Sequence, residues 1–183
     1  MKKVYIFLAE GFEEVEALMT VDILLRAGID MQMVSITGDK IVKGTHGIKI
    51  TADKLYEEIQ PQEADMLVLP GGMPGTTNLA AHEDLTTQLK EFHQKGKGLA
   101  AICAAPSVLG KNGILQGKQA TCYPGFEDTL ACARVVKESV VVDGNIITAK
   151  GLGVATEFAL AIVEKLVSRE KALEVKAQIQ CVD

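Results

Sequence analysis

The stretch Leu99-Ala100-Ala101-Ile102-Cys103-Ala104-Ala105-Pro106 decides the fold of this chain. A short apolar run leads directly into a cysteine flanked by small residues, and Pro106 is placed to open a helix. This order predicts a buried strand, a sharp turn and a helix. Small neighbours allow the backbone to bend tightly, which is the steric requirement of a nucleophile elbow. We therefore predict that Cys103 presents its thiol where a strand ends.

Apolar runs that end in glycine or proline recur on both sides of this stretch, and segments with helical spacing separate them. Alternation of this kind predicts an α/β fold with a mostly parallel central sheet and helices on both faces. We expect strands at residues 4–9, 31–36, 65–69, 99–102 and 119–122, hairpins at 41–51 and 140–148, and helices at 14–27, 55–59, 83–94, 155–167 and 169–178, besides the one opened by Pro106.

Composition and charge narrow the class of protein. The 183 residues are 48% hydrophobic and 23% charged, which is typical of an ordinary folded protein, and the length predicts a single domain over residues 1–183. A formal net charge of -5 and the lack of basic clusters disfavour direct binding of nucleic acid. The apolar runs are too short for a signal peptide or a bilayer span. We expect a cytoplasmic protein that binds no membrane.

The cysteines and histidines do not have the spacing of a metal site. No two cysteines form a CxxC pair, and no histidine stands at zinc-ligand spacing from a cysteine, so we expect neither a metal nor a cofactor. Without a secretory signal, the cysteines are expected to be free thiols in a reducing compartment. The cysteines are Cys103, Cys122, Cys132 and Cys181, and the histidines are His46, His82 and His93.

Three strand ends carry residues suited to chemistry: 10–16, 70–75 and Cys103. In open parallel sheets, binding sites form outside the carboxyl ends of the strands. There the dipole of the following helix favours a thiolate at Cys103, although a cysteine in an apolar run is also often a small buried hydrophobe. The backbone N–H groups of Gly71 and Gly72 are free to approach an anion, although a plain glycine turn explains them equally well.

Three carboxylates, Glu13, Glu14 and Glu16, open the helix after the first strand. Capping of that helix is the default role for each of them, because its dipole favours negative charge there. A carboxyl that faces the thiol instead would stay protonated and stabilise negative sulfur, or relay a proton during turnover.

Four motifs in this order resemble the DJ-1/PfpI superfamily, and most closely its DJ-1 and YajL (ThiJ-like) branch. They are Leu8-Ala9-Glu10-Gly11-Phe12-Glu13-Glu14-Val15-Glu16, Leu69-Pro70-Gly71-Gly72, Ala101-Ile102-Cys103-Ala104, and Gly151-Leu152-Gly153 followed by Phe158-Ala159-Leu160-Ala161-Ile162-Val163. The similarity covers nearly the whole chain. It implies a flavodoxin-like three-layer α/β/α sandwich that forms a homodimer.

The resemblance also implies roles for individual residues. Cys103 matches the family's nucleophile, and Glu16 matches the protonated glutamate beside it. Gly72 and Ala104 match the residues whose backbone N–H groups line the oxyanion pocket. Arg26 and His46 fall near positions that approach the site or the dimer interface in relatives.

Family activities include cofactor-independent glyoxalase, protein deglycation, oxidative-stress sensing through cysteine oxidation, and chaperone activity. Proteases of another branch carry histidine after the cysteine, and Ala104 stands there in this chain. The DJ-1 subgroup often has histidine before a proline where this chain has Tyr123, a poor base at neutral pH. The usual Gly-Pro-Gly-Thr is altered to residues 151–154, Gly-Leu-Gly-Val.

These observations favour a carbonyl-handling enzyme of lyase or hydrolase type over a protease. Its Cys103 would add to a small α-oxoaldehyde or to an early glycation adduct, with Glu16 moving the proton. The alternative is a non-enzymatic redox sensor or chaperone that uses oxidation of Cys103. A nucleotide-binding module fits the fold, but the sequence has neither GxGxxG nor a P-loop.

Overall fold

The computed structural model describes residues 1–131 and 133–181, so the expectation of a free thiol at Cys132 lies outside the described residues. A seven-stranded sheet in the order β10-β11-β7-β6-β1-β2-β5 forms the centre of the molecule. All neighbouring strands are parallel except the hairpin of β10 and β11. The strands are β1 (Lys3–Leu8), β2 (Asp30–Ser35), β5 (Lys54–Leu55), β6 (Met66–Leu69), β7 (Gly98–Ile102), β10 (Val140–Asp143) and β11 (Ile146–Ala149).

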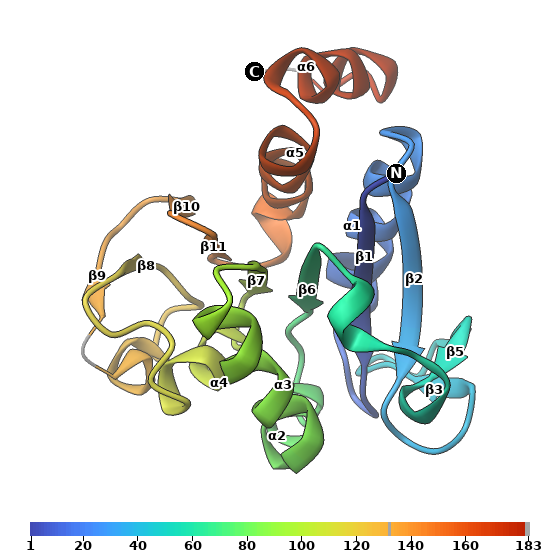
Figure 1. Cartoon of the computed structure of the whole chain (residues 1–183), viewed down its shortest axis with the longest axis vertical. Helices are drawn as coiled ribbons and strands as arrows, with labels where there is room; N and C mark the ends of the chain where they lie inside the picture. The colour runs from blue at the N-terminus through green and yellow to red at the C-terminus, as the bar shows by residue number, and fades with distance from the viewer. Residues whose placement is uncertain (132, 182–183) are drawn as a thin grey trace.

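Helices cover both faces of this sheet, and Figure 1 shows α5 and α6 on one side of the strands and α2, α3 and α4 on the other. Alternate residues of β1 point into two separate hydrophobic cores. Val4 and Ile6 pack with α1, α5 and α6 in the first core, whereas Tyr5 and Phe7 pack with α2, α3 and α4 in the second core. This arrangement confirms the predicted flavodoxin-like three-layer sandwich. The helices are α1 (Glu14–Arg26), α2 (Gly75–Ala81), α3 (Glu83–Gln94), α4 (Pro106–Lys111), α5 (Ala155–Leu166) and α6 (Arg169–Gln178).

Two small strand pairs lie outside the central sheet. The predicted hairpin over 41–51 is present as antiparallel β3 (Ile41–Lys43) and β4 (Lys49–Thr51). The strand predicted at 119–122 is shorter, because β8 (Gln119–Ala120) pairs only with the two-residue β9 (Arg134–Val135).

Two local predictions were wrong. The helix expected at 55–59 is replaced by β5 and a single 3-10 turn (Tyr56–Glu58), because this segment extends the sheet beside β2 before it turns. Helix α2 was not predicted. Its sequence, Gly-Thr-Thr-Asn-Leu-Ala-Ala, opens with weak helix formers, and burial of Leu79 in the second core stabilises it.

The carboxyl ends of β7, β6 and β1 are neighbours at one edge of the sheet. Cys103, the segment 70–75 and the segment 10–16 follow these three strands directly. The fold therefore places the three sequence motifs side by side. Among the described residues, no helix is long and apolar enough to cross a membrane.

Candidate active site

Cys103 sits on a strained turn between β7 and α4. Its φ of 64° lies in the left-handed region, which residues with a side chain seldom adopt and which costs about 1–3 kcal/mol. Two backbone hydrogen bonds hold the turn: the Cys103 N–H donates to the Ala149 carbonyl at 2.9 Å, and the Tyr123 N–H donates to the Cys103 carbonyl at 2.8 Å. The thiol is partly exposed at the edge of the first core. This geometry is that of a nucleophile elbow.

Glu16 lies beside this thiol, in the first turn of α1. Its side chain is buried, and Oε2 accepts a hydrogen bond from the Gly71 N–H at 2.9 Å. A Cβ placed on Gly71 would lie 2.5 Å from the Cys103 Cβ and 2.6 Å from Glu16 Oε2. Only glycine fits between the two side chains, because real Cβ atoms do not approach other atoms so closely. Gly71 therefore both holds the carboxyl and leaves room for the thiol.

Glu13 fixes where that helix begins. Its Oε2 accepts a hydrogen bond from the Glu16 N–H at 2.6 Å, which is the role of an N-cap residue. The capping role that the sequence allowed for all three glutamates thus belongs to Glu13. Glu16, one helical turn on, is left to face the thiol.

Two backbone donors point toward the sulfur. The N–H groups of Ala104 and Gly72 lie close enough to the Cys103 Sγ to lower the pKa of the thiol. Gly72 adopts a φ of 90°, a conformation that costs glycine little. The structure therefore brings together all four residues named from the sequence: Cys103, Glu16, Gly72 and Ala104.

The electrostatics of the pair differ from the expectation of a standing thiolate. Burial raises the pKa of Glu16 to about 7, against the opposing hydrogen bond from the Gly71 N–H. Burial, followed by the charge and hydrogen bond of Glu16, raises the pKa of Cys103 to about 12. Burial and the neighbouring carboxyl thus outweigh the two backbone donors. Above neutral pH the pair therefore retains one proton, which the two side chains share.

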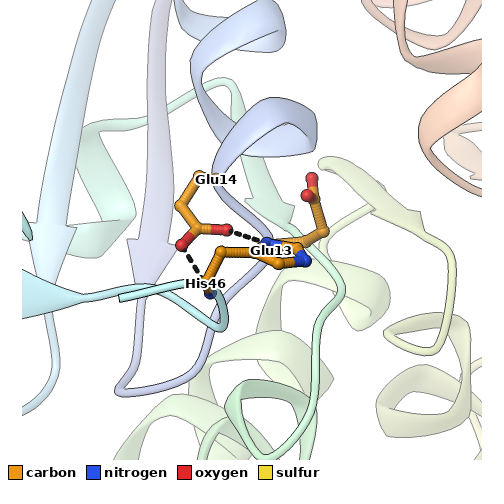
Figure 2. Close-up of side chains that lie close together, drawn as sticks. All are labelled: Glu13, Glu14 and His46. Carbon is orange, nitrogen blue, oxygen red and sulfur yellow. Dashed lines mark hydrogen bonds and ion pairs between the residues drawn. The ribbon is translucent and has the colours of Figure 1, made fainter. Parts of the chain in front are cut away.

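Glu14 faces away from the thiol and binds the loop between β3 and β4. Its Oε1 accepts from the His46 N–H at 2.7 Å, and its Oε2 lies 2.8 Å from the ring Nδ1, as Figure 2 shows. The hydrogen bonds from His46 outweigh burial and lower the pKa of Glu14, while the carboxylate raises the pKa of His46. His46 therefore tethers the hairpin to the start of α1 and does not reach Cys103.

Glu13, Glu14 and His46 each offer a ligand atom within 4.8 Å of the others, which is the spacing of a loose metal site. Both oxygens of Glu14 already bind His46, whereas Glu13 Oε1 is buried without a hydrogen-bond partner among the described residues. Arg26 lies at the other end of α1, about 15 Å along the helix from Glu16. It pairs with Asp22 at 2.6 Å and takes no part in the site of its own chain.

Tyr123 and Gly151 form the wall above the thiol. A Cβ placed on Gly151 would lie 3.4 Å from Tyr123 Cδ2 and 3.8 Å from both Cys103 Sγ and Glu16 Oε1. Sequence reasoning noted these positions only as departures from a family pattern. It missed Gly71 as the partner of Glu16, although the Pro-Gly-Gly turn after a buried strand marked a place where backbone N–H groups were available.

The chain is similar to known proteins over most of its length. The model of the DJ-1/PfpI family matches residues 2–165. Protein DJ-1 homolog B of Arabidopsis thaliana is 41% identical, over 97% of this chain and 41% of the plant protein, so the chain spans less than half the length of that relative. A protein of Pyrococcus abyssi that is named a deglycase is 34% identical, over 81% of this chain and 89% of its own.

A solved structure has the same fold throughout. Oxidized DJ-1 of Toxoplasma gondii superposes with a TM-score of 0.95 at 36% sequence identity, and the match covers 98% of each chain. The likeness includes the sheet, both helical layers and the strand ends that carry the site.

Proposed function

The chain belongs to the DJ-1/PfpI family, and on that premise we propose that it is a cysteine-dependent, cofactor-independent enzyme that detoxifies or repairs reactive carbonyls. Its substrates are small α-oxoaldehydes, such as methylglyoxal, or the early adducts that they form on proteins. The observation that carries this proposal is the buried pair of Cys103 and Glu16 beside two backbone N–H donors.

The first step uses the single proton of the pair. The Cys103 sulfur adds to the aldehyde carbon while Glu16 accepts the thiol proton, and the electrons of the C=O double bond move to oxygen. The N–H groups of Gly72 and Ala104 stabilise that oxyanion until Glu16 passes the proton to it, which gives a hemithioacetal and leaves Glu16 as a carboxylate.

The second step moves a proton between carbon atoms. Glu16 removes the proton from the former aldehyde carbon, which gives an enediolate, and returns it to the neighbouring carbon. The hydroxyl proton passes to the neighbouring oxygen, and a thioester of the 2-hydroxy acid is left on Cys103. Water then hydrolyses the thioester, releases the 2-hydroxy acid and restores the thiol. Glu16 suits both directions of transfer because its pKa, raised to about 7 by burial, lies near neutral pH.

The pKa of Cys103 favours this chemistry over redox sensing. Oxidation by peroxide proceeds through the thiolate, which a thiol with a pKa raised to about 12 by burial rarely forms on its own. Addition to a carbonyl also uses the N–H groups of Gly72 and Ala104, which stabilise the oxyanion that forms. The sensor or chaperone role is thus the alternative that the experiment below must exclude.

We also propose that the protein works as a cytoplasmic homodimer. Val15 at the start of α1 and Ile48 in the β3–β4 hairpin are both about half exposed, and burial of such side chains favours association. Sedimentation velocity at micromolar concentration should give twice the mass of 19.6 kDa, and a monomer at that concentration would contradict this part of the proposal.

The decisive test measures methylglyoxal turnover beside thiol oxidation. Wild-type protein should produce lactate, whereas Cys103→Ser should lose at least about 100-fold in kcat, because serine is a much weaker nucleophile with the same geometry. Cys122→Ser serves as the matched control, because Cys122 is buried in the other core. Full turnover by Cys103→Ser, or negligible turnover with rapid gain of two oxygens at Cys103 after mild peroxide, would overturn the proposal.

A further inference from the structure

We propose that the shallow cavity next to Cys103, under Tyr123 and Leu152, binds the apolar group of an aromatic α-oxoaldehyde and makes such compounds the preferred substrates. The inference rests on the proposed function and names the substrate class of that same site. It assigns a specificity role to two side chains that do no chemistry.

The cavity is large enough for one substituent of the substrate. Its volume is about 280 Å³, just below the range of pockets that enclose a drug-sized ligand. It therefore holds one ring or a short branched chain while the dicarbonyl end reaches the thiol. The lining residues are Tyr123, Pro124, Lys150, Gly151, Leu152, Gly153 and Val154.

The cavity lies beside the reacting atoms at Gly151, which forms part of its lining. A Cβ built on this residue would lie 3.4 Å from Tyr123 Cδ2 and 3.8 Å from both Cys103 Sγ and Glu16 Oε1. Tyr123, which also lines the cavity, is therefore close to the thiol. A ligand whose aldehyde carbon is bonded to sulfur places its other end against Tyr123 and Leu152.

The lining favours an apolar and neutral group. It contains no acidic residue, and its single cation, Lys150, donates through Nζ to the Lys137 carbonyl at 2.7 Å. Tyr123 is 51% exposed and Leu152 is 49% exposed, so each leaves apolar surface in water. An aromatic group would cover both, with ring stacking against Tyr123 in addition to burial. The methyl group of methylglyoxal is too small to cover either.

The test compares kcat/KM for phenylglyoxal and methylglyoxal in the wild type and in Leu152→Ser. We expect kcat/KM of the wild type to be about tenfold higher for phenylglyoxal than for methylglyoxal. In the variant this ratio should be about fivefold smaller, because the partial burial of one leucine is lost. Turnover of methylglyoxal should change less than twofold, because only the side chain is altered. Leu173→Ser, on the exposed face of α6, is the matched control.

A second measurement keeps the inference testable without turnover. Alkylation of Cys103 by N-phenylmaleimide and by N-methylmaleimide is followed by intact mass, with each rate divided by the rate for free cysteine. The wild type should prefer the phenyl reagent, and Leu152→Ser should reduce that preference by about fivefold. Equal preference in both proteins would overturn the subsite, whereas absent turnover with a retained phenyl preference would overturn only the proposed function.

Discussion

At the scale of single residues, the site depends on how Glu16 and Cys103 share one proton. Burial raises the pKa of both groups, so above neutral pH the carboxylate and the thiol form a pair that is set for proton transfer. The motifs in the sequence identified both partners. The protonation state was not predictable, because it depends on how far both groups are buried, which only the folded structure shows.

The raised pKa of Glu16 should appear in the stability of the protein. The folded state binds this proton more tightly than the unfolded state, so stability falls as pH rises from about 4.5 to about 7. The difference of 7 - 4.5 corresponds to at most about 3 kcal/mol. Glu16→Gln keeps an acceptor for the Gly71 N–H and removes the titration. Urea unfolding should therefore show Glu16→Gln gaining stability relative to wild type between pH 5 and pH 8; an unchanged difference would contradict the burial argument.

Gly71 should be the most sensitive position in the site. In Gly71→Ala the new methyl group would lie 2.5 Å from the Cys103 Cβ and 2.6 Å from Glu16 Oε2, so the pair must separate. A displacement of about 1 Å costs on the order of 100-fold in rate, and we expect at least that loss in kcat/KM for methylglyoxal. Gly153→Ala is the control, because a Cβ there meets nothing within 4 Å. Equal activity in the two variants would refute the assigned role of Gly71.

At the scale of elements, the sequence predicted the strands and long helices well and the short segments poorly. The buried runs at β1, β6 and β7 carry a strong apolar signal, and α3 begins and ends at the predicted residues, Glu83 and Gln94. The helix predicted at 55–59 is absent, and helix α2 was not predicted, for the same reason. Segments this short are determined by contacts with the sheet and the second core, which outweigh local propensity.

The β3–β4 hairpin should be tethered to α1 over a limited pH range. The tether is complete while Glu14 is ionised and His46 is protonated, so it weakens below the lowered pKa of Glu14 and above the raised pKa of His46. In an NMR titration the pKa of His46 should lie above the ordinary histidine value of 6.5, and Glu14→Gln should bring it back toward that value. An unshifted His46 in the wild type would show that the ion pair does not form in solution.

At the scale of the whole molecule, the two hydrophobic cores support different helices. The core of α1, α5 and α6 supports the helix that carries Glu16, and the other core supports α2, α3 and α4. The family motifs predicted this three-layer arrangement before any contact was known. They could not predict the cavity under Tyr123, because its shape depends on how residues 150–154 fold against Tyr123 and Pro124.

Phe158 should be essential to the first core. Its side chain is fully buried between α5 and the sheet, so Phe158→Ala should lower the free energy of unfolding by about 3–5 kcal/mol in urea. Leu173→Ala, with 55% of the side chain exposed, should change it by about 0.5 kcal/mol or less. Similar losses in both variants would mean that α5 does not pack as described.

The measurement that tests the central claim most directly is the pH dependence of kcat/KM for methylglyoxal in wild type and in Glu16→Gln. If Cys103 and Glu16 share one proton, wild-type kcat/KM should rise as pH increases through about 7 and then level off, because burial raises the pKa of Glu16 to about 7. The step should disappear in Glu16→Gln together with most of the activity. A rise through pH 7 that persists in Glu16→Gln would contradict the account.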